Sequence, residues 1–175
     1  MLNPNLDRGH YRAVRWSADN KLSATDFGSK AGVTVSSSKH KGAKILVIDD
    51  SKTIRRSAEN LLSQEGFEVI TANDGYEALA KVVEHNPDII FVDIMMPRLD
   101  GYQTCALIKN NARYSSIPII LLSSKDSIFD KARGRIVGSQ FYLTKPFTRD
   151  DLLGAIDEHL GSPADATEKA AEENA

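Results

Sequence analysis

The chain has 175 residues, of which 41% are apolar, and a formal net charge of −2 at pH 7. This length supports one domain of ordinary size plus tails, and the near-neutral charge argues against nucleic acid as a partner. The single cysteine, Cys105, excludes an internal disulfide and is expected to pack on a helix, which fits a reducing, cytoplasmic location. No stretch approaches the roughly 18 apolar residues of a membrane helix, so no membrane insertion is expected.

The two ends of the chain differ in composition from its centre. Residues 1–43 hold seven Lys or Arg against three Asp or Glu, a charge of +4, with no sustained apolar periodicity. They are predicted to form a flexible, Ser-containing basic arm. Its aromatic residues Tyr11, Trp16 and Phe27 leave a docking peptide as the alternative. Residues 161–175 hold four acids against one lysine and are predicted to be a disordered acidic tail.

Residues 44–160 alternate strand and helix patterns five times. The predicted strands are 44–48, about 67–72, 88–92, 118–122 and 140–144. The predicted helices are about 52–65, a helix with Leu79, Val82 and Val83 on its apolar face that closes at Asn86, a helix beginning near Asp100, about 127–137, and a last helix after Pro146. This alternation predicts an α/β domain with a parallel sheet, helices on both faces and right-handed crossovers.

Charged and polar side chains close the predicted strands. Asp49 and Asp50 follow the first strand, Asp93 the third, Ser123 the fourth and Lys145 the fifth. Ligands of parallel sheets bind beyond the carboxyl ends of the strands, so these side chains are expected to meet. Three crowded carboxylates repel one another unless a cation lies among them, and their oxygens suit Mg²⁺. The pattern predicts a metal and phosphoryl site in which Asp93 is the nucleophile.

Each residue also has a purely structural interpretation. Asp50 or Ser51 alone is compatible with a helix cap, and Asp93 alone is compatible with a turn. Lys145 alone is compatible with a solvated surface charge. Three acids, a hydroxyl and a lysine at the ends of separate strands are difficult to explain as unrelated caps and turns.

The motifs at these strand ends resemble a known family. They are Asp49-Asp50, Asp93 with Met96-Pro97 and Asp100-Gly101, Ser123, and Lys145-Pro146-Phe147. Through them, residues 44–160 resemble the receiver domain of two-component response regulators, the chemotaxis-type domain. The stretches 50–57 and 133–147 are further similar to the twitching-motility, PilG-like branch. The resemblance implies a doubly wound, flavodoxin-like (βα)5 fold with five parallel strands in the order 2-1-3-4-5.

The resemblance also implies roles for the site residues. Asp93 is the expected phosphoacceptor, taking a phosphoryl group from a histidine kinase or a histidine phosphotransfer domain. Mg²⁺, with Mn²⁺ as a substitute, is expected on Asp49, Asp50, Asp93 and the backbone carbonyl of Met95. Lys145 is expected to pair with the acids before phosphorylation and with the phosphoryl oxygens after it.

Signalling is expected to follow from a switch. The resemblance makes Ser123 and Tyr142 the switch pair, with Tyr142 moving between exposed and buried rotamers, and places partner docking on about 127–160. It also implies a cis bond before Pro146. The tail at 161–175 is too short and polar for an output domain, so a single-domain regulator acting by protein docking is expected. It is not expected to be an enzyme beyond its own phosphotransfer and autodephosphorylation.

Three other classes compete with this interpretation. An unphosphorylated receiver-like scaffold predicts the loss of acidic-site residues, and none is lost. An aspartyl-phosphate phosphohydrolase places its acids as D-x-D after the first strand, whereas Asp49 and Asp50 are adjacent. A flavodoxin-like electron carrier needs a hydroxyl- and glycine-rich phosphate loop, where this chain has Asp50-Ser51-Lys52-Thr53.

Overall fold

The computed structural model describes residues 40–124, 138–139 and 141–160, and the backbone of 14–16 and 22–23. Its strands form one sheet in the order β2-β1-β7-β6-β5-β3-β4. Their bounds are β1 Val14–Trp16, β2 Leu22–Ser23, β3 Lys44–Ile48, β4 Glu68–Ala72, β5 Ile89–Asp93, β6 Ile119–Ser124 and β7 Phe141–Lys145.

The strands β3 to β7 form the predicted parallel sheet. Counted from β3, their order is 2-1-3-4-5, which confirms the flavodoxin-like arrangement. In the register, Ile48 pairs with Val92 and Val92 with Leu121, so the three central strands lie level with one another. All five side chains of β5 are buried, as expected for a strand covered on both faces.

In the described residues, four helices connect or follow these strands, and each begins at a residue whose side-chain oxygen accepts a backbone N–H. The helices are α1 Lys52–Gln64, α2 Gly75–His85, α3 Gly101–Lys109 and α5 Arg149–His159, with the caps Ser51, Asp74, Asp100 and Thr148. The helix predicted at 127–137 lies outside the described residues. Within the described part of the chain, no helix is both long enough and apolar enough to cross a membrane.

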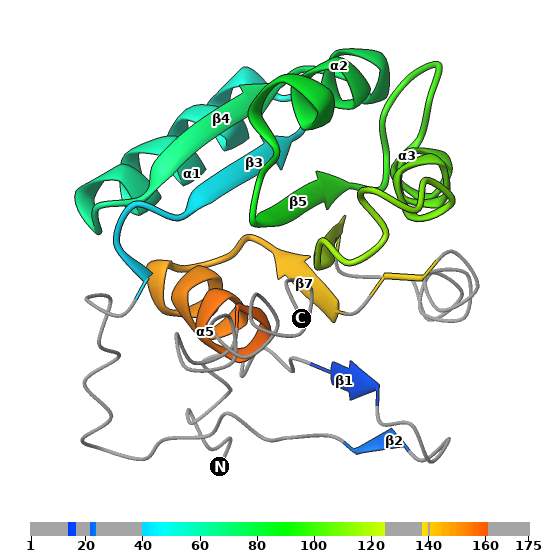
Figure 1. Ribbon diagram of the computed structural model, residues 1–175. Helices are drawn as coiled ribbons and strands as arrows, with labels where there is room; N and C mark the ends of the chain where they lie inside the picture. The colour runs from blue at the N-terminus through cyan, green and yellow to red at the C-terminus, as the bar shows by residue number, and fades with distance from the viewer. Residues whose placement is uncertain (1–13, 17–21, 24–39, 125–137, 140, 161–175) are drawn as a thin grey trace, which may run out of the picture.

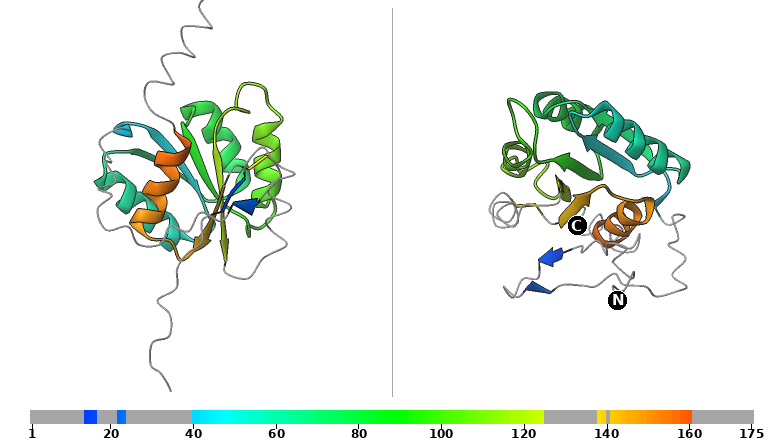
Figure 2. Two further views of the ribbon diagram at one scale, coloured as in Figure 1. Left: turned by 90° about the horizontal axis from the view of Figure 1, so that it is seen from below. Right: turned by 180° about the vertical axis from the view of Figure 1, so that it is seen from behind.

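The helices cover both faces of the sheet, as the view along it shows (Figure 2). Side chains of α2 and α3 pack with one face of the sheet in a cluster that includes Tyr102, Cys105 and Tyr142. Side chains of α1 and α5 pack with the other face around Phe91 and Phe141. Neighbouring residues of β7 therefore point to opposite cores, as the alternation of a strand requires.

Several details of the predicted elements are wrong. The sequence pattern predicts that both Val82 and Val83 lie on the apolar face of α2, but Val83 is 59% exposed and only Val82 of the two is buried in the core. The fourth strand spans Ile119–Ser124 instead of 118–122, so Ser123 lies within β6. The third and fifth strands each lie one residue later than predicted, at Ile89–Asp93 and Phe141–Lys145. Pairing of Ser123 and Ser124 with β7 extends the fourth strand, and apolar periodicity does not predict this pairing.

An antiparallel ribbon extends the sheet beyond β7. Val14 and Arg15 of β1 pair with Tyr142 and Phe141, and β1 pairs in turn with β2. Figure 1 shows the ribbon in blue, alongside β7. Neither strand is predicted by the sequence, which has no apolar periodicity there. The remainder of the predicted arm before residue 40, and the tail at 161–175, lie outside the described residues.

Candidate functional site

Three carboxylates meet at the carboxyl edge of the parallel strands. Asp49 follows β3 and is fully buried, Asp93 ends β5 and is nearly so, and Asp50 is exposed. One carboxylate oxygen from each lies within 4.8 Å of the others. The level register of β3 and β5 brings the three residues together, as the sequence predicts.

Lys145, at the end of β7, bridges two of these acids. Its Nζ lies 2.7 Å from Oδ2 of Asp49 and 2.9 Å from Oδ1 of Asp93. Lys145 lies 52 positions after Asp93 and 96 after Asp49 in the sequence, and the sheet brings it into direct contact with both. The surface-charge interpretation of Lys145 therefore does not hold.

Burial and charge act against each other at the site. Burial raises the pKa of Asp93, the hydrogen bond and charge of Lys145 lower it, and the charge of Asp49 raises it, with a net increase. Burial alone would lower the pKa of Lys145, but its hydrogen bonds to Asp49 and Asp93 and their charges outweigh burial and raise it. Lys145 is thus held as a cation, and its charge limits the rise in the pKa of Asp93.

The first acidic loop has its own network of hydrogen bonds. The Ser51 amide donates to Oδ1 of Asp49 over 2.8 Å, which fixes that carboxylate. Arg55 Nη1 donates to the backbone carbonyls of Asp49 and Asp50 at 2.6 and 3.0 Å. Ser51, whose Oγ accepts from the Ile54 amide, is the cap of α1. Ser51, and not Asp50, is therefore the cap of α1, and Asp50 belongs to the acidic cluster.

The loop after β5 packs closely against the backbone of Asp93 and Ile94. The Met95 amide donates to Oδ1 of Asp93 over 3.3 Å, while the Met95 side chain is 71% exposed. The Gly101 amide donates to the carbonyl of Ile94 over 3.0 Å. A Cβ at Gly101 would lie 2.8 Å from Cα of Ile94 and closer still to the carbonyl oxygen of Asp93. Only glycine fits where α3 begins beside the site.

The two residues expected to form the switch lie in neighbouring strands. Ser123 is buried in β6, and its hydroxyl donates to the carbonyl of Ser124 over 3.0 Å. Tyr142 is buried in β7, with its hydroxyl oxygen 2.6 Å from that of Tyr102. The cis bond expected between Lys145 and Pro146 is present. The structure thus shows Tyr142 in a buried position.

The side chains present fit a divalent cation. Three carboxylates and one ammonium carry a formal charge of −2 together, which a divalent ion would neutralise. The oxygen donors are of the type that Mg²⁺ and Mn²⁺ prefer. Because Lys145 engages one oxygen of Asp49 and one of Asp93, the exposed carboxylate of Asp50 is the most accessible donor of the three.

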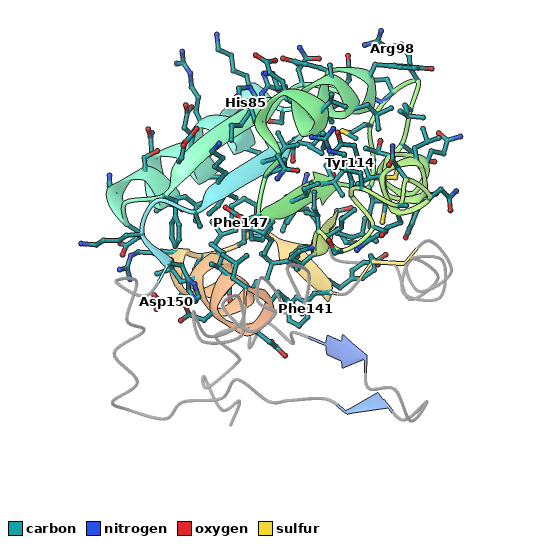
Figure 3. The ribbon with its side chains drawn as sticks, in the orientation of Figure 1. His85, Arg98, Tyr114, Phe141, Phe147 and Asp150 are labelled. Atoms are coloured by element: carbon teal, nitrogen blue, oxygen red, sulfur yellow. The ribbon has the colours of Figure 1, made fainter. Side chains whose placement is uncertain are left out.

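Three residues near the site have roles that sequence patterns do not reveal. Arg55 binds the acidic loop, Tyr102 binds Tyr142, and Arg98 forms an ion pair with Asp74 and lies over the ring of Tyr76. Figure 3 shows Arg98 projecting from the surface of the molecule. For Arg98, the sequence indicates only a loop position directly after Met96-Pro97, and this position does not reveal its partner Asp74.

Asp74 offers a test of local stability beside the site. Its carboxylate accepts from the Glu77 amide over 2.8 Å, which lowers its pKa below 3.8; burial opposes this and the Arg98 charge assists it. Arg98 is largely exposed, so the cap should outweigh the ion pair. Asp74→Ala is expected to lower the free energy of unfolding by about 0.5–2 kcal/mol at neutral pH.

The pH dependence of that loss has a definite sign. A carboxylate with a lowered folded-state pKa stabilises the fold above its unfolded pKa, and the contribution disappears as the pH falls through the folded value. Urea unfolding should therefore show the difference between wild type and Asp74→Ala narrowing below pH 3.8. Asp74→Asn, which keeps a capping oxygen without the charge, should lose less. If Asp74→Ala lost the same unfolding free energy at every pH down through this range, the charge of Asp74 would not contribute to the stability of the cap.

Comparison with known proteins agrees with the fold and the site. The family described as response regulator receiver domain matches residues 45–157. Protein PilG of Pseudomonas aeruginosa is 67% identical over 127 residues, which cover 71% of this chain and 94% of that protein. Response regulator MprA of Mycobacterium leprae is 38% identical over 130 residues, covering 73% of this chain and 56% of its own length.

Solved structures show the same relationship. Chemotaxis protein CheY4 of Vibrio cholerae superposes with a TM-score of 0.65 at 36% identity, over 67% of this chain and 98% of that one. A putative response regulator of Chloroflexus aurantiacus gives a TM-score of 0.66 at 31% identity, over 69% and 98%. With its five parallel strands, its acidic cluster and these similarities, the chain belongs to the response regulator receiver domain family.

Proposed function

We propose that this protein is a response regulator that accepts a phosphoryl group on Asp93 and signals by docking on other proteins. The observation that carries the proposal is the position of Lys145, whose ammonium contacts both Asp49 and Asp93 at the carboxyl edge of the sheet. The proposal is supported by the presence of a buried carboxylate, an ammonium and a cluster of three carboxylates in one place. A scaffold without phosphotransfer has no need for all three.

The proposed step moves a phosphoryl group from a phosphohistidine to Asp93. A carboxylate oxygen of Asp93 forms a bond to phosphorus, the bond between phosphorus and the donor imidazole nitrogen breaks, and that nitrogen takes up a proton. Phosphoryl transfer depends mainly on positioning and on neutralising charge. Lys145 supplies a fixed positive charge on the inner side of Asp93, within 2.9 Å of its carboxylate.

The metal belongs to the same proposal. Asp49, Asp50 and Asp93 would hold Mg²⁺, together with the backbone carbonyl of Met95, and the ion would neutralise phosphoryl oxygens when bound. The amide of Ser51 keeps the Asp49 carboxylate oriented for this role. Mn²⁺, with similar ligand preferences, is expected to substitute.

The output is proposed to pass through Ser123 and Tyr142 to a partner that docks on about 127–160. Ser123 of β6 pairs with Thr144, the residue before Lys145, and Tyr142 lies three residues before Lys145 on the same strand. Only part of the docking region is described. The similarity to protein PilG over most of that protein's length supports the twitching-motility branch, and with it a role in pilus-driven motility or taxis. The histidine kinase and the output partner are proposed as classes.

Phosphorylation from a small donor tests the proposal directly. The full chain, incubated with acetyl phosphate, is expected to gain one phosphoryl group in the presence of Mg²⁺ or Mn²⁺ and none when the metal is chelated. Intact-mass spectrometry measures the gain, and removing the donor serves as the control. No incorporation under any metal, from acetyl phosphate or from a phosphorylated histidine phosphotransfer domain, would favour the alternative of an unphosphorylated scaffold.

A further inference from the structure

Arg55 of α1 is hydrogen-bonded to the backbone of two residues of the acidic cluster. Its Nη1 donates to the carbonyl of Asp49 over 2.6 Å and to the carbonyl of Asp50 over 3.0 Å. Hydrogen bonds from a charged donor are stronger than those between neutral groups, so both contacts restrain the loop. One half-buried guanidinium therefore holds two successive peptide units at the start of the site.

The position of Arg55 runs against the usual charge preference of a helix. Arg55 is the fourth residue of α1, and the first turn of this helix contains no acidic residue. The amino end of a helix carries a partial positive charge, which favours anions and disfavours cations. The guanidinium of Arg55 reaches back past the helix start to carbonyl oxygens, which carry partial negative charge. A residue that breaks a local rule in this way is expected near a functional site.

The two carboxylates of this loop are held in different ways. The carboxylate of Asp49 is buried and accepts hydrogen bonds from the Ser51 amide and from Lys145. Asp50 is exposed, and Arg55 holds its carbonyl. A side chain is carried by its own backbone, so fixing the peptide unit of Asp50 limits the directions in which its carboxylate can point. Arg55 therefore acts chiefly on the orientation of Asp50.

We propose that Arg55 is a positioning residue that holds the acidic loop in the conformation that binds the divalent cation. This rests on the proposed function, in which Asp49, Asp50 and Asp93 bind Mg²⁺. Without Arg55, the loop would sample further conformations, and metal binding would have to order them. Residues that orient metal ligands typically contribute about 10-fold to 100-fold to metal affinity. Because Arg55 is only half-buried, we expect the lower value, about tenfold.

The sign of the effect separates positioning from simple electrostatics. Removing a positive charge near a cation site strengthens cation binding by Coulomb's law alone. Loss of positioning has the opposite effect and weakens binding. Arg56→Ala is the matched control, because Arg56 is the next residue of the same helix, carries the same charge and is exposed. Its replacement should leave the metal affinity unchanged or raise it slightly.

The test is a calorimetric titration of Mg²⁺, and separately of Mn²⁺, into the metal-free full chain. Arg55→Ala is expected to weaken binding about tenfold, and Arg55→Lys, which keeps the charge and one donor, should recover part of the loss. Circular dichroism verifies the fold, and Arg55→Lys provides the comparison if Arg55→Ala folds poorly. Metal affinity in Arg55→Ala equal to or higher than that of wild type would overturn the proposal.

Phosphorylation from acetyl phosphate gives a second measure. Arg55→Ala should incorporate the phosphoryl group more slowly than wild type when Mg²⁺ is limiting. At saturating Mg²⁺ the rates should be equal, because the substitution leaves Asp93 and Lys145 in place. A general loosening of the fold would slow incorporation at every Mg²⁺ concentration, and that result would count against a positioning role.

The two proposals fail in distinguishable ways, because the titration measures metal binding without phosphotransfer. If Arg55→Ala weakened metal binding but no chain accepted a phosphoryl group, the proposed function would fail and this inference would stand. If wild type were phosphorylated and Arg55→Ala bound metal as tightly as wild type, this inference would be wrong and the proposed function would stand. If wild type bound neither Mg²⁺ nor Mn²⁺, the proposed metal site and this inference would both be wrong.

Discussion

Replacing Asp93 by asparagine is expected to reduce phosphoryl incorporation from acetyl phosphate and Mg²⁺ to the level seen without a donor. The amide that replaces the carboxylate is a poor nucleophile and a weaker metal ligand, so both proposed roles of Asp93 are lost. The variant should fold, because Lys145 retains its 2.7 Å contact with Asp49. Intact mass measures incorporation, and circular dichroism verifies the fold.

Asp100→Asn is the matched control for that experiment. Asp100 is also an acid in the segment that follows β5, but it caps α3, where asparagine caps a helix about as well as aspartate. Incorporation in Asp100→Asn should therefore equal that of wild type. Equal incorporation in Asp93→Asn and wild type would remove Asp93 as the phosphoacceptor and redirect the search to Asp49 and Asp50.

Replacing Gly101 by alanine is expected to destabilise the protein by about 1–3 kcal/mol or more. The added Cβ would meet backbone atoms of Asp93 and Ile94, which belong to a fully buried strand and its continuation and have little freedom to move away. Relieving the clash requires α3 to shift from β5 or the Asp93 backbone to shift from β3. Either movement disturbs the geometry between Asp93 and Lys145, so phosphorylation should also slow.

Gly154→Ala provides a control of opposite sign. Gly154 lies inside α5, and a Cβ there would meet no heavy atom within 4 Å. Alanine in a helix interior is favoured over glycine by about 0.8–1.0 kcal/mol. Chemical denaturation should therefore show Gly101→Ala below wild type and Gly154→Ala at or above it. A Gly101→Ala protein as stable as wild type would mean that the approach of α3 to β5 is not tightly constrained.

The parallel sheet and its acidic edge could be predicted because both rest on local patterns. The end of an apolar run long enough for a buried strand indicates where the strand ends. In a parallel sheet, the residues at that end lie at the carboxyl edge, where ligands bind. Asp49, Asp93 and Lys145 each follow or end such a run, so their meeting follows from the fold class alone. The register of β3 with β5 then determines the actual spacing.

The contacts that could not be predicted depend on the paths of side chains after the elements have packed. Val82 and Val83 are both apolar neighbours on α2, and only the direction in which the helix packs on the sheet decides that Val83 faces solvent. The hydrogen bond between Tyr102 and Tyr142 joins residues 40 positions apart that have no sequence signature as a pair. The pairing of β1 with β7 likewise joins a segment without strand periodicity to the edge of a sheet.

The pairing of β1 with β7 implies an order of events as the chain folds. Val14 and Tyr142, which face each other in this pairing, are 128 positions apart. Contacts between such distant segments require closure of a long loop and form late. During synthesis, β1 leaves the ribosome long before β7 has been made, so it has no edge on which to pair until the five parallel strands are complete. The strand β1 is therefore synthesised before the five parallel strands and added to their sheet after them.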